Sequence, residues 1–411
     1  MPDPLVQEFL AERIGGKDFG KDITVYKFEK IKRAKRAAMA ANPGIELIDL
    51  GVGEPDGMTP ELIVETLAAE ARKPENRGYT DNGIAEFREA AACYMDKVFG
   101  VKGLDPQTQI NHSIGSKSAL ALLPSALVDP GDVVLMTVPG YPVFGTHSSW
   151  YGAEVVNLPL TEENCFLPEL DSIDGETARG AKVLVLNYPN NPTGKCATRE
   201  FFSRVVEFAH RHKVAVIQDA AYAALVYGRN PLSFLSIDGA MEVGIELHSL
   251  SKSYNMTGWR IGFVCGNERL VKAFAEVKDH SDSGQFAAIQ KAAIVGLDNP
   301  QFTEEICLKY ERKLKLLCEV FAGLGFTVRM PEGTFYIYMK TPKGIASGER
   351  FATAEDCSQY LIREHLISTV PEHTAGPYLR LSATFIAPTP EEEKRIAAEI
   401  TKRLDGVRFE F

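Results

Sequence analysis

The sequence predicts an α/β protein with a mainly parallel sheet sandwiched by helices and a smaller α+β domain. Near-continuous apolar runs at 154–160, 182–189 and 213–219 have the length of buried strands, and helical patterns such as 199–212 separate them. Apolar strands that alternate with helices are typical of a parallel sheet covered on both faces. From residue 267 long amphipathic helices follow, which indicates that the chain leaves the sheet. Functional loops are then expected at the carboxyl ends of the strands.

Length and composition bound the organisation of the chain. Its 411 residues exceed one simple core, so we expect an N-terminal arm with part of the small domain (1–48), a large domain (49–290) and a small C-terminal domain (291–411). The net charge of -10 argues against nucleic acid or an anionic membrane as a partner. Seven cysteines without a CxxC pair, and histidines that do not cluster, predict reduced thiols and no metal site. We find no basic-then-apolar leader and no membrane-length apolar run, so a cytoplasmic location is expected.

The N-terminal third predicts a helical arm followed by ligand-binding loops. A short strand at 45–50 runs into GVGEPDGMTP, whose glycines permit close approach, so Gly53 could offer its main chain to a substrate. Thr59 is predicted to cap the helix that follows. Tyr79 stands at the start of the next loop, where a single tyrosine is as consistent with packing as with function.

A glycine turn and a Pro-Gly turn come next. In HSIGSKSALALLPSAL the amides of Gly115, Ser116 and Lys117 could cradle a phosphate at a helix N-terminus, although the pattern is neither GxGxxG nor a Walker loop. Tyr141 follows a buried strand in VPGYPVF. Its ring could stack on a planar ligand, and core packing is the alternative.

Two strand ends carry polar side chains. Asn187 and Asn191 flank the turn YPNNPTG, which is consistent with plain turn chemistry or with a ligand. Asp219 ends the apolar run KVAVIQ, and Tyr222 follows it. A carboxylate there costs free energy unless it is paired, so a protonated heterocycle nitrogen is a natural partner; capping the next helix is the alternative.

The stretch SLSKSYNMTGWRIG follows another apolar run and has the composition of a covalent cofactor site. Lys252 could bind an aldehyde, while Ser249, Ser251 and Arg260 hold a phosphate; a strand-to-loop turn without a ligand is the alternative.

Arg380 stands on the apolar strand YLRLSAT. A buried arginine needs an anion, either a substrate carboxylate held by two hydrogen bonds or an internal acidic side chain.

Taken together and in their order along the chain, the motifs described above resemble those of the fold-type I pyridoxal-phosphate aminotransferases of classes I and II. The resemblance covers nearly the whole chain. The resemblance implies that Lys252 holds pyridoxal 5'-phosphate covalently and carries the proton, and that Asp219 contacts the pyridine nitrogen. It places Asn191 and Tyr222 near the ring hydroxyl and stacks Tyr141 on the ring.

The same resemblance implies phosphate, substrate and partner contacts. The phosphate would be held by Gly115, Ser116, Lys117, Ser249 and Arg260, with Ser251 nearby. Tyr79 would reach the phosphate of the neighbouring subunit, which implies a homodimer with shared active sites. The α-carboxylate of the amino-acid or keto-acid substrate would be fixed by Arg380, Asn187 and Gly53.

Within that family, IGGKDFGKDITVYKFEKIKR, YTDNGIAEFR and LGVGEPDGMTPE are most similar to the LL-diaminopimelate aminotransferases. These interconvert LL-diaminopimelate and 2-oxoglutarate with tetrahydrodipicolinate and glutamate in lysine biosynthesis. Tyr26 would then reach across the dimer to the distal end of the substrate, in a pocket that Lys117 and Tyr141 line. The chain departs from the plant-type enzymes by having Asp81 in place of a glutamate, and HSDSGQ where they carry an asparagine. The shorter carboxylate could act through a water or a shifted loop.

Two kinds of alternative stay open: another aminotransferase of the same fold, or a protein of another class. An aspartate, alanine or aromatic aminotransferase would keep every cofactor residue and differ in the distal pocket. A β-lyase or decarboxylase would use the same lysine. A non-catalytic regulator is disfavoured by the acidic charge and by the lack of an appended DNA-binding segment.

Overall fold

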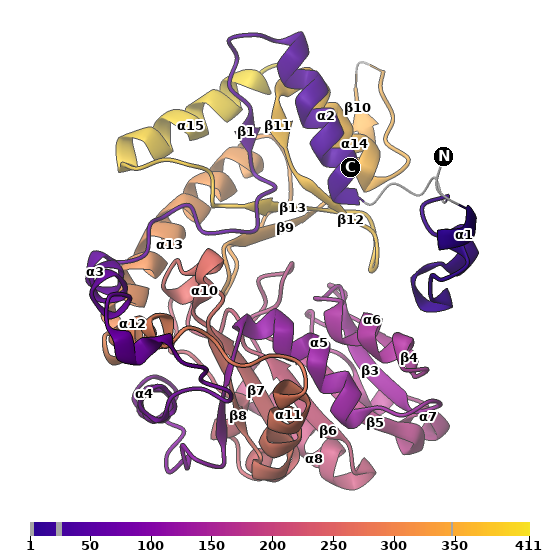
Figure 1. Cartoon of the computed structure of the whole chain (residues 1–411). Coiled ribbons are helices and arrows are strands. Elements are labelled where there is room, and N and C mark those ends of the chain that lie inside the picture. The colour runs from indigo at the N-terminus through magenta and orange to yellow at the C-terminus, as the bar shows by residue number, and fades with distance from the viewer. Residues whose placement is uncertain (1–3, 22–26, 347) are drawn as a thin grey trace.

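The computed structural model describes residues 4–21, 27–346 and 348–411. Figure 1 shows a larger body built on a twisted sheet and a smaller body against one end of it. Tyr26, predicted to contact the distal end of the substrate, lies outside the described residues.

The larger body contains a seven-stranded sheet with the order β2-β8-β7-β6-β5-β3-β4 among the described residues. Its strands are β2 (Ile110–Ser113), β3 (Val133–Val138), β4 (Glu154–Pro159), β5 (Ala181–Asn187), β6 (Ala215–Asp219), β7 (Gly244–Ser249) and β8 (Gly262–Gly266). Strands β4, β3, β5, β6 and β7 pair in parallel, and β8 runs antiparallel to both of its neighbours. The prediction of a mainly parallel sheet is therefore confirmed.

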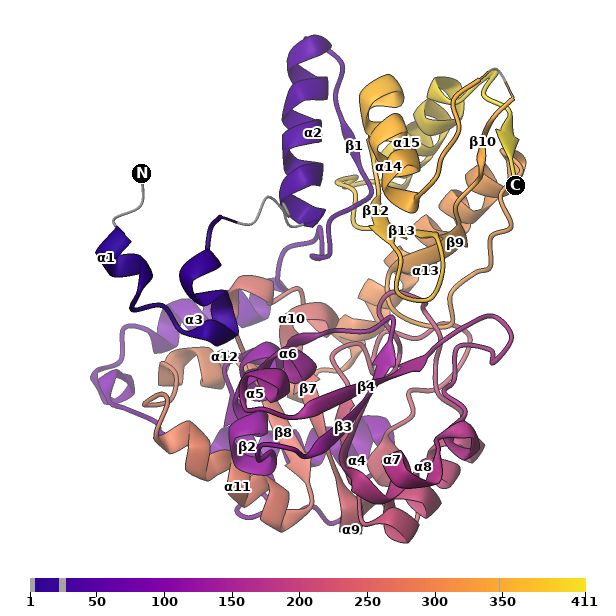
Figure 2. The ribbon, with the colours of Figure 1, turned by 90° about the vertical axis from the view of Figure 1, so that its right-hand side faces the viewer.

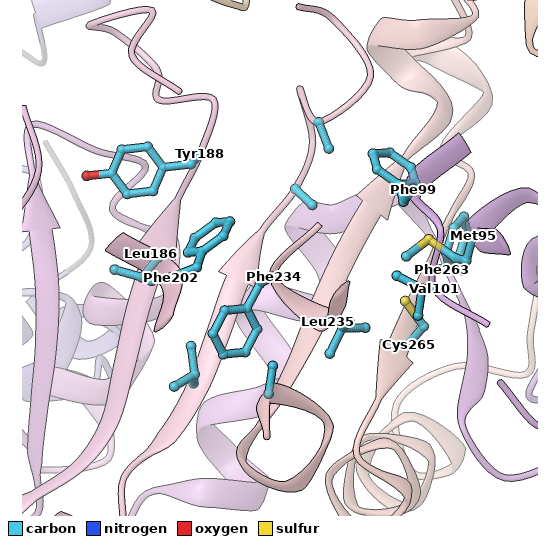
Figure 3. Close-up of a cluster of buried hydrophobic side chains, with 14 of the residues drawn as sticks. Met95, Phe99, Val101, Leu186, Tyr188, Phe202, Phe234, Leu235, Phe263 and Cys265 are labelled. Atoms are coloured by element: carbon cyan, nitrogen blue, oxygen red, sulfur yellow. The ribbon is translucent and has the colours of Figure 1, made fainter. Parts of the chain in front are cut away.

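Helices cover both faces of this sheet because successive strand residues are apolar on opposite sides. On β5, Leu184 and Leu186 belong to a core with helices α4 (Ala85–Phe99), α8 (Arg199–His212) and α12 (Ala287–Asp298). Figure 3 shows part of that core, in which Phe202 packs edge-on against Phe234. Val183 and Val185 belong to the core on the other face, with helices α5 (Gly115–Leu127), α6 (Val143–Trp150) and α11 (Glu268–Asp279).

The smaller body combines the two ends of the chain. Its antiparallel sheet has the order β12-β13-β9, and its helices are α2, α13, α14 and α15. Helix α2 packs on α14, and β1 pairs in parallel with β11, so residues 27–49 join the C-terminal part. These elements are α2 (Lys27–Ala41), β1 (Ile48–Asp49), α13 (Gln301–Gly323), β9 (Tyr336–Lys340), β10 (Gly344–Ile345), α14 (Ala354–His365), β11 (Ile367–Ser368), β12 (Val370–Glu372), β13 (Tyr378–Ser382), α15 (Pro390–Arg403) and β14 (Phe409–Glu410).

The remaining elements are short or peripheral. They are α1 (Pro4–Gln7), α3 (Glu61–Glu70), α7 (Gly175–Gly180), α9 (Ala240–Val243), α10 (Leu250–Ser253) and the 3₁₀ turns η1 (Glu12–Ile14), η2 (Gly16–Asp18), η3 (Pro74–Arg77), η4 (Leu170–Ser172), η5 (Phe234–Ser236) and η6 (Thr257–Trp259). Figure 2 shows α1 standing apart from both bodies, and its Leu5 and Val6 are exposed. Among the described helices, none combines the length and the apolar character that a membrane crossing requires.

Two local predictions differ from the structure. The strand predicted at 45–50 is reduced to β1, because β1 pairs only with the two-residue β11. Thr59 does not cap a helix: its hydroxyl donates to the carbonyl of Asn255 at 3.0 Å, and α3 begins two residues later, after Pro60. The predicted domain boundaries at 48/49 and 290/291 stay predictions, and the packing of α12 against α3 and α4 favours a boundary after α12.

Candidate active site

A cavity of about 800 Å³ lies at the carboxyl ends of β5, β6 and β7, and residues of the smaller body also line it. The predicted site residues that line this cavity are Gly53, Ser116, Lys117, Tyr141, Asn187, Asn191, Asp219, Tyr222, Ser249, Ser251, Lys252, Arg260 and Arg380. Segments more than 300 residues apart in sequence thus meet in one place.

Lys252 projects from α10, the short helix directly after β7. The hydroxyl of Ser249 caps this helix by accepting from the amide of Ser251 at 3.2 Å. The Lys252 Nζ donates to the carbonyl of Gly53 at 2.9 Å. Burial lowers the pKa of Lys252 to about 8. The Glu54 carboxylate acts in the opposite direction, and the Arg260 charge lowers the pKa further. A substantial fraction of the amine is therefore neutral near pH 7 to 8 and can act as a nucleophile or base.

Asp219 is the last residue of β6 and is 4% exposed. Its Oδ1 accepts from the amide of Ala221 at 3.2 Å, but residues 221–224 form a turn, so Asp219 does not cap a helix as the alternative required. We find no lysine or arginine paired with this carboxylate in the described part of the chain. Burial raises the pKa of Asp219 to about 7. A buried carboxyl without a cationic partner fits a ligand that brings a protonated ring nitrogen.

Asn187 joins the strand ends to the following turn. Its Nδ2 donates to the carbonyl of Asp219 at 3.0 Å, and its Oδ1 accepts from the amide of Asn191 at 3.0 Å. Both partners that the structure gives this side chain are main-chain groups, so Asn187 fixes the position of Asn191 in the cavity wall.

The start of α5 and Arg260 form a polar corner at the cavity. Gly115 has a φ of +72°, which favours glycine, and a Cβ there would lie 2.4 Å from the Arg260 Nη2, so the guanidinium would have to shift. Arg260 Nη1 donates to the carbonyl of Thr257 at 2.8 Å and to the Ser251 hydroxyl at 3.4 Å. Ser116 follows at the helix N-terminus, where amide groups favour negative charge.

Arg380 lies on β13 and is 7% exposed. Its guanidinium donates to the carbonyl of Gly51 at 3.1 Å and to the Asn191 Oδ1 at 3.3 Å, and lies 4.4 Å from the centroid of the Tyr336 ring. Its buried Nε has no hydrogen-bond partner among the described residues. The internal acidic partner that sequence reasoning left open is not found there, so the positive charge is available for an anion.

Of the predicted site residues that the structure describes, Gly115, Tyr79 and Asp81 do not line the cavity of their own chain. Tyr79 is 87% exposed, and Asp81 sits next to it in a left-handed conformation with a φ of 42°. The loop is attached to the segment HSDSGQ, because the Thr80 hydroxyl donates to the carbonyl of Gln285 at 2.7 Å and the Thr80 amide donates to that of Ser283 at 3.3 Å. The two segments predicted to recognise the distal group therefore form one unit.

Tyr336 is the main site residue that sequence reasoning missed. Its hydroxyl lies 3.0 Å from that of Tyr222, and a Cβ on Gly53 would lie 2.9 Å from the same oxygen. Burial and the contact with Tyr336 raise the pKa of Tyr222 well above its usual value, so its phenol stays protonated. The tyrosines in FYIYMK were the available signal, but nothing in the local pattern separates them from core tyrosines.

A buried cluster on β7 and β8 was not predicted either. Cross-strand pairing brings ligand atoms of Glu246, His248 and Cys265 within 4.8 Å of one another. The carboxylate of Glu246 accepts from the Ser233 hydroxyl, the Phe234 amide and the His248 ring at 2.8, 2.6 and 2.9 Å. These hydrogen bonds account for the burial of the carboxylate.

Comparison with known proteins identifies the family. Residues 45–400 match the family described as aminotransferase class I and II. The LL-diaminopimelate aminotransferase of Methanocaldococcus jannaschii is 57% identical over 99% of both chains, and that of Methanococcus maripaludis is 55% identical over 99% of both. Among solved structures, substrate-bound BacF from Bacillus subtilis superposes with a TM-score of 0.86 at 30% identity over 98% of both chains. A mutant aspartate aminotransferase from Thermus thermophilus superposes with a TM-score of 0.83 at 26% identity, over 96% of this chain and 99% of the other. The predicted family is confirmed: the chain belongs to the class I and II aminotransferases.

Proposed function

We propose that this protein is a pyridoxal-phosphate-dependent LL-diaminopimelate aminotransferase, which interconverts LL-diaminopimelate and 2-oxoglutarate with tetrahydrodipicolinate and glutamate in lysine biosynthesis. The observation that carries the substrate assignment is the 57% identity over 99% of both chains with a relative of that name. The aminotransferase chemistry is supported independently, because a buried amine, an uncompensated carboxyl and an uncompensated guanidinium line one cavity.

The residues of the cavity fit pyridoxal 5'-phosphate. Asp219 would hold the ring nitrogen in its protonated form, and Tyr141 would stack on the ring. Asn191 and Tyr222 would lie near the ring hydroxyl, and Lys252 would attach the aldehyde. The phosphate would be held by Gly115, Ser116, Lys117, Ser249, Ser251 and Arg260, around the corner where a Cβ on Gly115 would clash. When bound, the cofactor supplies an electron sink that makes the α-hydrogen of an amino acid acidic.

Lys252 would move the proton. Its free Nζ would accept the α-proton of the amino acid and would donate a proton again later in the reaction. A pKa of about 8 gives the amine a strength suited to both steps near neutral pH. Its hydrogen bond to the Gly53 carbonyl holds the Nζ inside the cavity.

Arg380 would bind the α-carboxylate that amino-acid and keto-acid substrates share. Its buried Nε has no hydrogen-bond partner among the described residues, and its Nη2 donates to the Gly51 carbonyl, so a carboxylate could add charge-assisted hydrogen bonds to a guanidinium that is already held in place. Asn187 and Gly53 line the same cavity and would complete the carboxylate site.

We also propose a cytoplasmic homodimer in which each subunit completes the site of its partner. Tyr79 would reach the partner's phosphate, while Tyr26 and Asp81 would contact the distal end of the partner's substrate beside Lys117 and Tyr141. Support comes from the exposure of Tyr79, which lies outside its own cavity.

The half-reaction tests the proposal. The protein loaded with pyridoxal phosphate is mixed separately with LL-diaminopimelate, meso-diaminopimelate, aspartate, alanine and phenylalanine, without keto acid. We expect rapid conversion to the pyridoxamine form with LL-diaminopimelate alone. Conversion mainly by aspartate or phenylalanine would refute the substrate assignment and keep the reaction class, whereas release of pyruvate and ammonia or of carbon dioxide would indicate a lyase or a decarboxylase.

A further inference from the structure

The loop 51–58 carries Gly53 between β1 and α3. It is anchored by the buried carboxylate of one of its own residues, Asp56. The Asp56 side chain is 3% exposed, and its Oδ2 accepts from the Nζ of Lys313 at 2.9 Å and from the Nζ of Lys309 at 2.7 Å. Its Oδ1 accepts from the Tyr310 hydroxyl at 3.0 Å, and that hydroxyl in turn accepts from the Asp56 amide at 3.3 Å. All three partners lie on α13, so this helix holds the loop from below.

Lys313 connects the loop to a second element of the site. Its side chain is fully buried, and its Nζ also donates to the carbonyl of Phe385 at 2.5 Å while lying 4.1 Å from the centroid of that ring. Phe385 follows β13, the strand on which Arg380 lies. One ammonium group therefore joins the Gly53 loop to the extension of the Arg380 strand.

The loop and the strand extension also contact each other directly. The Ser382 amide donates to the carbonyl of Leu50 at 2.6 Å, and the Thr384 hydroxyl donates to that of Val52 at 2.9 Å. The loop passes close to β9, because a Cβ on Gly53 would lie 2.9 Å from the Tyr336 hydroxyl. A displacement of the loop therefore changes the distance between the Gly53 main chain and the Arg380 guanidinium.

A buried ion pair is weak grounds for stability, because desolvation of both charges offsets much of their attraction. Such a pair does fix geometry, because either charge left alone in the interior is strongly unfavourable. We propose that Asp56 and Lys313 are positioning residues that hold the Gly53 loop and the Arg380 strand in register, so that the two together bind the α-carboxylate of amino and keto acids. The proposal rests on the function proposed above and adds two residues to it.

The test compares Asp56→Asn and Lys313→Met with the control Arg312→Met. Arg312 is the neighbouring residue on α13 and makes a two-point ion pair with Glu393 of α15 at 2.6 and 2.8 Å, and none of its hydrogen bonds reaches the loop. In the loaded enzyme we expect Asp56→Asn and Lys313→Met to raise KM for both LL-diaminopimelate and 2-oxoglutarate about tenfold or more, with a smaller change in kcat. The absorbance of the bound cofactor should not change. Arg312→Met should lower the Tm and keep both KM values within about twofold of wild type.

A second readout does not depend on activity. Hydrogen exchange followed by mass spectrometry should show faster exchange of the amides of 51–58 in Asp56→Asn, with no change in α3. If Lys313→Met does not fold, the double variant Asp56→Asn/Lys313→Met replaces it, because it removes both of the most buried charges and leaves only the partly exposed Lys309 without its partner.

The outcomes separate this proposal from the substrate assignment. Unchanged KM values in folded Asp56→Asn, or an equal rise in Arg312→Met, would overturn the positioning role. If the wild type prefers another amino acid, only the substrate assignment fails. The KM of each variant relative to that of wild type is then measured with that amino acid and its keto acid.

Discussion

Asp219→Asn should change how the stability of the cofactor-free protein depends on pH. The carboxyl is buried, and burial raises its pKa to about 7 from an ordinary value of 3.8. A raised carboxyl pKa contributes stability that is fully present below the unfolded-state pKa and is lost as pH rises through the folded-state value. The difference corresponds to roughly 4 kcal/mol as an upper limit, of which roughly 2 kcal/mol would be lost between about pH 5 and pH 7.

Urea unfolding at a series of pH values measures this contribution. In the wild type without cofactor, the free energy of unfolding should fall across that range relative to Asp219→Asn, because the amide does not titrate. Loading the wild type with pyridoxal phosphate should remove most of this fall in the free energy of unfolding, since a protonated ring nitrogen stabilises the ionised carboxylate. Parallel curves for the cofactor-free wild type and variant would refute the argument that Asp219 is held without a cationic partner.

Three further substitutions test other parts of the site. Lys252→Ala should abolish the absorbance band of the covalently held cofactor, and an unchanged spectrum would exclude Lys252 as the attachment point. Arg380→Lys should raise KM for both the amino acid and the keto acid about tenfold or more, because the paired guanidinium geometry is lost; unchanged constants would remove Arg380 from the carboxylate site. Gly115→Ala should weaken cofactor binding about tenfold or more by equilibrium dialysis, because a Cβ would lie 2.4 Å from Arg260 at a φ of +72°; unchanged affinity would show that this corner does not bind phosphate.

The sequence predicted the parts of the site that follow strands of the large sheet. Asn187 and Asp219 end β5 and β6, and Lys252 follows β7, so the apolar runs themselves place these residues at one edge. A parallel sheet leaves little freedom there, because adjacent strands end together. The predicted fold class succeeded for the same reason.

Contacts between the two bodies could not be predicted in this way. Tyr336 faces Tyr222 only because β9 of the smaller sheet approaches the loop after β6. Asp56 and Lys313 are 257 residues apart, and a charged residue on an amphipathic helix ordinarily indicates a solvated face. Thr59 failed as a cap because a tertiary hydrogen bond to Asn255 replaced the local one. Each case depends on a long-range distance, which no local pattern contains.

The cavity is lined by Asp219, Lys252 and Arg380, and the described part of the chain forms no ion pair with any of the three. Burial moves the pKa of Asp219 upward and that of Lys252 downward, and the buried Nε of Arg380 has no hydrogen-bond partner among the described residues. Each is unfavourable in the folded chain alone, because buried charges require partners. A cofactor with a protonated ring nitrogen and an aldehyde would pair with Asp219 and Lys252, and the carboxylate of a substrate would pair with Arg380. Ligand binding therefore relieves an unfavourable contribution to the free energy of the folded chain. We expect the cofactor to raise the Tm of this protein more than that of Asp219→Asn.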